Sequence, residues 1–201
     1  HWLQLPSCFT EHLSRLNFSF LCSLTAYLGD VVVVVGRLPL PPDASLAATM
    51  SGRRPEHVAP PAVYYSSKEA SKYATSSRNA TVQAALTERC LELLALPASP
   101  PVPHLLLDVG SGTGMSTAIL SAEGHHVIAY DISPPMLAQA SAAHGDRLVA
   151  DAGAGGFVCR PGTLDGAVSV SAIQWLCVAT SSEEVPRQRM KAFFTALYTG
   201  L

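Results

Sequence analysis

The sequence lacks an excess of positive charge. It contains 13 Lys and Arg against 15 Asp and Glu, which gives a formal net charge of −2 at pH 7. A protein that coats nucleic acid is usually strongly basic. The composition therefore excludes that class, and any contact with RNA has to be local or shared with a partner. Hydrophobic residues make up 48% of the chain, which is enough for one domain with a sizeable core and argues against global disorder.

Paired cysteines are also lacking. The cysteines are odd in number, and none belongs to a C-x-x-C pair. They are Cys8, Cys22, Cys90, Cys159 and Cys177. This pattern argues against a disulfide scaffold or a zinc knuckle and favours a reducing compartment. His125 and His126 stand where a loop meets a predicted strand, and we predict no metal site there.

No uninterrupted apolar run is long enough to span a membrane. The most hydrophobic stretch, residues 20–42, contains five consecutive valines but is interrupted by two glycines and by Asp30. It also lacks the basic start and the small-residue cleavage site of a secretory signal. We therefore predict that residues 1–49 are an appended, poorly ordered segment that the domain does not need for stability. A targeting segment is the alternative, and Met50 resembles a natural start.

What the chain does contain is an alternation of helical patterns and short apolar runs. The first helical pattern runs from Ser66 to Leu96, with Val82, Leu86, Cys90 and Leu93 on one face. Strands that alternate with helices imply an α/β fold with a doubly wound parallel sheet. We expect an N-terminal extension and helix over 50–103 and a partial ligand-binding core over 104–201. The expected strands are 104–109, 126–131, 147–151 and one within 164–176, and the expected helices of the core are 115–124, 133–145 and 186–200.

A glycine loop follows the first of these strands. In LLLDVGSGTG, residues 105–114, three glycines alternate at Gly110, Gly112 and Gly114. Glycines allow a backbone to approach a ligand closely, and such a loop lies beyond the carboxyl ends of parallel strands. A dinucleotide site needs G-x-G-x-x-G, but position 115 is Met115. The G-x-G-x-G spacing favours S-adenosylmethionine.

Acidic residues at the ends of strands strengthen this prediction. Asp108 lies two residues before the loop. Asp131 ends the second expected strand, where a carboxylate can accept hydrogen bonds from both ribose hydroxyls. Asp151 ends the third, where it can accept from the adenine amino group. A bare structural turn and a dinucleotide site are the alternatives at this point.

Beyond the loop, residues 51–199 resemble the eukaryotic 18S rRNA (guanine-N7) methyltransferases of ribosome biogenesis. The stretches that carry the resemblance are GRRPEH, PPAVYY, EASKY, SSR and LELLALP before the loop, and EGHHVIAYDISPPML, RPGTLDGAVSVSAIQWLC and FFTALY after it. These pieces are not general methyltransferase features, so the resemblance is specific. Ser111 stands where the family commonly has cysteine.

The resemblance implies a Rossmann-like class I fold and S-adenosylmethionine-dependent methylation of N7 of a guanine in 18S rRNA. Gln174 and Trp175 would lie near the transferred methyl group and the target base. Tyr64 and Tyr65 would belong to a segment that closes over the cofactor, although a helix packed on the sheet edge is the alternative. The residues implied to hold the cofactor are Asp108, Gly110, Ser111, Gly112, Gly114, Asp131, Ile132, Asp151, Tyr73 and Arg78.

The resemblance also implies partners and a location. The substrate would be small-subunit rRNA within a pre-ribosome, and a small zinc-binding activator protein would pair with the edge of the third strand as a heterodimer. The protein would act in the nucleus, in the nucleolus and nucleoplasm, and also in the cytoplasm, away from membranes.

Folds of this family continue past the position of Leu201 with a fifth parallel strand. We therefore expect a core that is incomplete at its C-terminus, an unpaired apolar edge on the fourth strand and little activity. A small-molecule or lipid methyltransferase on the same fold, and an inactive truncated product, are the alternatives.

Overall fold

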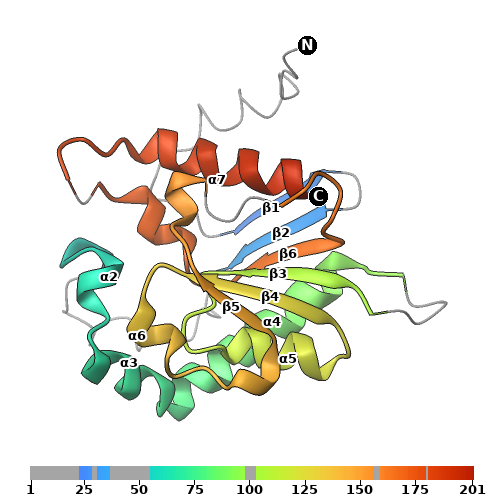
Figure 1. Cartoon of the computed structure of the whole chain (residues 1–201), viewed down its shortest axis with the longest axis horizontal. Coiled ribbons are helices and arrows are strands. Elements are labelled where there is room, and N and C mark those ends of the chain that lie inside the picture. The colour runs from blue at the N-terminus through green and yellow to red at the C-terminus, as the bar shows by residue number, and fades with distance from the viewer. Residues whose placement is uncertain (1–22, 29–30, 37–54, 98–102, 156–158, 180) are drawn as a thin grey trace, which may run out of the picture.

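The computed structural model describes residues 23–28, 31–36, 55–97, 103–155, 159–179 and 181–201. A six-stranded sheet in the order β1-β2-β6-β3-β4-β5 forms its centre, with helices on both faces (Figure 1). The strands are β1 (Ser23–Leu28), β2 (Val31–Gly36), β3 (Leu105–Val109), β4 (His126–Asp131), β5 (Asp146–Val149) and β6 (Gly166–Ser169). The α-helices are α2 (Pro61–Tyr64), α3 (Ser67–Ala74), α4 (Ser77–Leu94), α5 (Met115–Ala122), α6 (Pro134–Leu137) and α7 (Pro186–Gly200). The 3-10 turns are η3 (Pro55–His57), η4 (Ala142–His144), η5 (Ala152–Ala154) and η6 (Ile173–Cys177).

Strands β3 to β6 form the parallel core that the sequence predicts. β3 pairs in parallel with β4 and with β6, and β4 pairs in parallel with β5. Helices α4 and α5 cover one face, and α7 covers the other (Figure 1). The doubly wound parallel sheet is therefore confirmed, and the four strands lie close to their expected positions.

The alternation of side chains along the strands divides the core into two layers. Below α4 and α5, Leu106 and Val168 pack with apolar side chains of both helices, including Leu86 and Leu120. On the opposite face, apolar residues of β3 and β4 pack beneath α7, which contributes Phe193. A strand that is buried on both faces needs a nearly continuous apolar run, which explains the LLL of β3.

The long first helix is split in two. Ser66 caps α3 and Ser76 caps α4, because their hydroxyls accept hydrogen bonds from backbone N–H groups three residues later. The buried face of α4 is also turned slightly from the predicted one. Val82 is 48% exposed, whereas Gln83 and Leu86 are buried. The prediction for Val82 is wrong because the helix turns a glutamine toward the cavity described below.

Helix α6 is shorter than expected. Ser133 caps it as predicted and accepts a hydrogen bond from the N–H of Met136 at 3.4 Å. The helix then ends at Leu137, and the turn η4 follows. The predicted helix over 133–145 is therefore only one helical turn and a 3-10 turn.

The fourth strand of the core is not an open edge. β2 runs parallel to β6, with Val33 opposite Ala167 and Val35 opposite Ser169. β1 then pairs antiparallel with β2 on the outside. The expectation of an unpaired β6 edge is wrong, because a hairpin from within residues 1–49 covers it. At the other side of the sheet β5 is outermost, and its Val149 is 59% exposed.

Candidate cofactor and acceptor site

The glycine loop joins β3 to α5 and presses against the turn after β6. Gly110, Gly112 and Gly114 all have positive φ, at 67°, 56° and 79°. A Cβ on Gly110 would lie 2.3 Å from the Cβ of Ala172, so no larger residue fits there. Gly110 therefore lies in close contact with the protein's own chain at Ala172. The close approach of a ligand to the loop stays a prediction.

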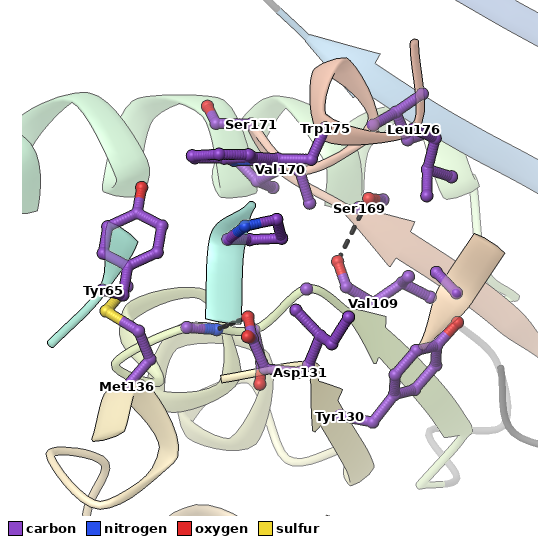
Figure 2. A pocket seen from close by; sticks show the side chains of 18 of the residues that line it. Tyr65, Val109, Tyr130, Asp131, Met136, Ser169, Val170, Ser171, Trp175 and Leu176 are labelled. Carbon is purple, nitrogen blue, oxygen red and sulfur yellow. Dashed lines mark hydrogen bonds between the residues drawn. The ribbon is translucent and has the colours of Figure 1, made fainter. Parts of the chain in front are cut away.

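Asp131 fastens this loop to the end of β4. Its Oδ2 accepts a hydrogen bond from the N–H of Gly112 at 2.9 Å (Figure 2). Its Oδ1 accepts one from the N–H of Ser133 at 2.8 Å. Burial raises the pKa of the carboxyl, and these backbone hydrogen bonds oppose the shift. Each carboxylate oxygen has a second lone pair, so Asp131 can still accept from ligand hydroxyls.

Asp108 supports the loop from behind. It is 1% exposed, and its Oδ2 accepts hydrogen bonds from the hydroxyls of Ser116 at 2.7 Å and Thr117 at 2.6 Å, in the first turn of α5. Burial raises its pKa to about 6, although the two hydroxyls oppose this shift. Asp108 therefore holds β3 and α5 together beneath the loop and is not part of the cavity wall.

A cavity opens beyond the carboxyl ends of the strands, where ligands bind in open α/β sheets. Its wall includes the glycine loop, the ends of β4 and β6, the turn η5, and residues of α3 and α7. The structure thus brings together most residues that the sequence analysis selects. Those that line the cavity are Tyr73, Gly110, Ser111, Gly112, Asp131, Ile132, Asp151 and Trp175.

Four of the selected residues do not line the cavity. Asp108 lies behind the loop, and Gly114 begins α5 against Ala140. Arg78 is exposed on α4. Gln174 is exposed as well, and its amide donates a hydrogen bond to the carbonyl of Ser171 at 2.5 Å. A direct role of these side chains in ligand binding stays a prediction.

Aromatic side chains lie across the cavity from Asp131, and of these Tyr65, Tyr73 and Trp175 line it, whereas Tyr64 does not. The ring of Trp175 lies 5.6 Å from that of Tyr65 and 5.9 Å from that of Tyr64, between centroids, and Tyr65 lies 6.1 Å from Tyr73. In Figure 2, Trp175 lies across the cavity from Asp131. Burial raises the pKa of Tyr65 and Tyr73, so both phenols stay neutral hydrogen-bonding groups. Tyr65 and Tyr73 of this segment line the cavity. That the segment closes over a ligand stays a prediction.

The structure adds cavity residues that the sequence analysis missed. Ser171 has a φ of 59°, which is unusual for a residue other than glycine, and its hydroxyl accepts a hydrogen bond from the buried amide of Gln83 at 3.3 Å. Arg189 reaches the cavity from α7. No local signal marks these residues, because each becomes part of the site only through packing between distant segments.

The cavity has the polar groups that an adenosyl ligand needs. The hydroxyls of Ser111 and Thr113 are buried, and within the described part of the chain neither has a hydrogen-bond partner. Both residues line the cavity beside Asp131, and Ile132 and Met136 add apolar surface. Buried polar groups are almost always paired, so the two hydroxyls indicate a place for a polar ligand.

A metal centre has no comparable support. No group of three or more His, Cys, Asp or Glu that could hold a metal ion is found among the described residues. Within the same residues, no helix is both long enough and apolar enough to cross a membrane.

Comparison with known proteins points to the same chemistry as the glycine loop. Residues 107–196 match the family model described as a methyltransferase domain. The 18S rRNA (guanine-N(7))-methyltransferase RID2 of Arabidopsis thaliana is 52% identical over 150 residues, which cover 74% of this chain and 51% of that protein. The 18S rRNA (guanine-N(7))-methyltransferase of Mus musculus is 46% identical over 151 residues, covering 74% of this chain and 53% of that protein.

Solved structures support the fold. Magnesium protoporphyrin IX methyltransferase of Synechocystis PCC 6803, with bound SAM, aligns with a TM-score of 0.50 over 74% of each chain at 12% identity. At this identity the likeness concerns the fold alone.

The chain spans about half the length of the curated relatives that it matches. Over the matched part the resemblance seen in the sequence is confirmed. Residues 107–196 match a methyltransferase domain, and the chain is similar to the 18S rRNA (guanine-N7)-methyltransferases over the matched part.

Proposed function

We propose that the chain is an S-adenosylmethionine-dependent methyltransferase that modifies N7 of a guanine in 18S rRNA. The observation that carries the proposal is the 52% identity to an 18S rRNA (guanine-N(7))-methyltransferase, together with a cavity built around the glycine loop. This identity favours rRNA over a small-molecule or lipid acceptor, which the fold alone would allow.

The cavity residues suit an adenosyl ligand. Asp131 would accept hydrogen bonds from the ribose hydroxyls, Ile132 would pack beside the adenine, and Asp151 would face the edge of that base. S-adenosylmethionine supplies a methyl group on a positively charged sulfur. The carboxylates of Asp131 and Asp151 and the backbone of the glycine loop hold and orient the ligand, which is the main contribution such a site makes to a displacement.

The acceptor chemistry explains why a general base is unnecessary. N7 of guanine carries a lone pair and no proton, so the attack on a methyl group leaves no proton for the enzyme to remove. The aromatic group of Tyr64, Tyr65 and Trp175 provides surfaces on which an unstacked RNA base can pack. Orientation of the base against the ligand, with water excluded, is then the task of these side chains.

Transfer of labelled methyl groups tests the proposal. The chain is incubated with S-adenosylmethionine and small ribosomal subunits that lack the modification, and N7-methylguanine is located by borohydride reduction and aniline cleavage of the 18S rRNA. The expectation of little activity rested in part on an unpaired β6 edge, and β2 covers that edge. We therefore expect cleavage at one guanine with the unchanged chain and none with Asp131→Ala. Methylation of a small acceptor in place of the rRNA would support the alternative, and failure to bind the ligand at all would refute the enzyme assignment.

A protein partner and a cellular location belong to the same proposal. The outer edge of β5 has backbone groups that a strand of another chain can pair with. Val149, the last residue of this strand, is exposed. A small zinc-binding activator protein is the proposed partner, and ribosome biogenesis in the nucleus, with some protein in the cytoplasm, is the proposed setting. Co-elution of the two purified proteins as a heterodimer, with increased methyl transfer, tests the partner. A fluorescent fusion excluded from the nucleus would contradict the location.

A further inference from the structure

Arg189 is a buried arginine held between two carboxylates at the cavity wall. It lies in the first turn of α7 and is 9% exposed. Its Nη2 donates to Oδ1 of Asp151 at 3.1 Å, and its Nη1 donates to Oε2 of Glu184, also at 3.1 Å. A buried guanidinium is costly unless it is paired, so these two contacts fix where the positive charge lies.

Gly153 provides the space for this arrangement. It is buried in η5, and a Cβ at this position would lie 2.2 Å from Nε of Arg189. The N–H of Gly153 also donates to Oδ1 of Asp151 at 2.8 Å. The same carboxylate oxygen therefore receives one hydrogen bond from the backbone of η5 and one from the guanidinium of α7.

These contacts set the direction of the Asp151 side chain. A carboxylate is planar, so fixing Oδ1 toward η5 and α7 also fixes the direction of Oδ2. Asp151 and Arg189 both line the cavity, beside Ile132. The carboxylate is only partly exposed, with 34% of the side-chain surface accessible. A partly buried, doubly held carboxylate is a precise acceptor, because little freedom is left to lose when a ligand binds.

We propose that Arg189 is a positioning residue that aims Asp151 at the exocyclic amino group of a bound adenine and so gives the cavity its preference for that base. The inference rests on the proposed function, because it takes an adenosyl compound as the ligand. Since α7 packs against η5, the docking of this helix and the choice of the base depend on the same contact.

The test compares two ligands that differ at the Watson–Crick edge of the base. S-adenosylhomocysteine has a 6-amino donor beside an unprotonated N1. S-inosylhomocysteine has a 6-oxo acceptor, which Asp151 cannot satisfy, beside an N1 that carries a hydrogen. Calorimetry on the full chain should show that the adenine ligand binds at least about tenfold more tightly, as expected for a charge-assisted hydrogen bond. Arg189→Met should bring the two affinities to within about threefold of each other. Arg187→Met, which removes an exposed arginine of the same helix, should keep the preference.

Two further variants separate positioning from a general loss of structure. Gly153→Ala keeps every charged group but crowds the guanidinium, so it should reduce the preference as Arg189→Met does. Arg189→Lys keeps the charge and should restore part of the preference. Combining Arg189→Met with Asp151→Ala should reduce the preference no further than Asp151→Ala alone. If Arg189→Met fails to fold, Gly153→Ala decides the question.

The outcomes distinguish this inference from the proposed function. Should the unchanged chain bind neither ligand, the proposed function itself is refuted. Should it prefer the adenine ligand while Arg189→Met or Gly153→Ala, folded as judged by circular dichroism, keeps the full preference, only the positioning role is overturned. Equal loss of the preference in Arg187→Met would overturn it as well.

Discussion

The two halves of the sheet are assembled in different ways. In the half that carries the glycine loop, β3, β4 and β5 follow one another along the chain, and each pairs with the next. In the other half, β6 pairs on its far side with β2, which comes from near the beginning of the chain. The first half is marked by local signals, namely apolar runs, glycines and aspartates at strand ends. The second half depends on a pairing that no local signal announces.

The largest predicted effect is a loss of stability on removal of the β1–β2 hairpin. A chain that starts at Met50 lacks β1 and β2 and leaves β6 without its outer neighbour. Losing the ladder with β6 and the contacts between β2 and α4 should cost about 3–5 kcal/mol of unfolding free energy, at about 1 kcal/mol for each hydrogen bond plus the exposed apolar surface. In a domain of this size that corresponds to a fall of about 10 °C in Tm.

Thermal unfolding measures this loss, and a chain that starts at Ser23 is the matched control because it keeps both strands. The glycine-loop half should remain able to bind S-adenosylhomocysteine at a temperature where the shortened chain is folded. The composition of residues 1–49 predicts instead that this segment is dispensable. Equal melting of the Met50 chain and the full chain would support that view and would show that the β2–β6 pairing contributes nothing in solution.

The next prediction concerns Asp108, at the centre of the glycine-loop half, and the pH dependence of the unfolding free energy. The pKa of Asp108 is raised from 3.8 to about 6, so the folded state favours the protonated carboxyl. Its contribution to stability is complete below pH 3.8 and is lost as the pH rises through about 6. Asp108→Asn keeps an acceptor for Ser116 and Thr117 but cannot ionise. Its stability relative to the unchanged chain should therefore rise by about 2 kcal/mol between pH 4 and pH 7.

Urea unfolding across this pH range measures the difference. Asp146→Asn, at the exposed start of β5, is the control for the same chemical change at an exposed position. A difference in unfolding free energy between Asp108→Asn and the unchanged chain that stays constant from pH 4 to pH 7 would contradict the prediction. It would mean that the pKa of Asp108 is not raised in solution and that its carboxyl is accessible to water.

The third prediction separates ligand binding from stability. Asp131→Ala removes the carboxylate expected to accept from the ribose, which should weaken S-adenosylmethionine binding by about 1.5–3 kcal/mol. Calorimetry gives this value directly, and Glu123→Ala at the exposed end of α5 should leave the affinity unchanged. An unaltered dissociation constant in Asp131→Ala would remove this residue from the ligand site. The Met50 chain, by contrast, should lose stability and keep its affinity.

The same division explains how much the sequence could predict. Local features of the sequence, namely the spacing of apolar residues, helix caps and glycine turns, predict the four core strands, the Ser133 cap and the glycine loop. They also predict the grouping of Asp131 with Asp151. The buried face of α4 was misplaced at Val82 because a polar residue, Gln83, is buried there to meet Ser171. The pairing of β2 with β6 was missed for a related reason. A run of valines shows that a strand can form, but it does not specify which edge the strand will join.

The smallest effect is expected at the open edge of the glycine-loop half. Val149 lies on β5, the outermost strand on this side, and it is 59% exposed, so its side chain already faces solvent in large part. Val149→Ser should change the unfolding free energy by no more than about 0.5 kcal/mol, because an exposed position loses little packing and only a modest strand propensity.

Val168→Ser in β6 is the matched comparison. Val168 is fully buried in the layer beneath α4 and α5, so the same chemical change there creates a cavity and buries a hydroxyl. Urea unfolding of both variants in the isolated chain measures the loss of unfolding free energy in β6, which β2 covers, and in β5, which has no outer neighbour in the described sheet. A loss above about 1 kcal/mol for Val149→Ser would show that the β5 edge is already covered in the isolated chain, and it would remove the main structural support for a partner strand at that edge.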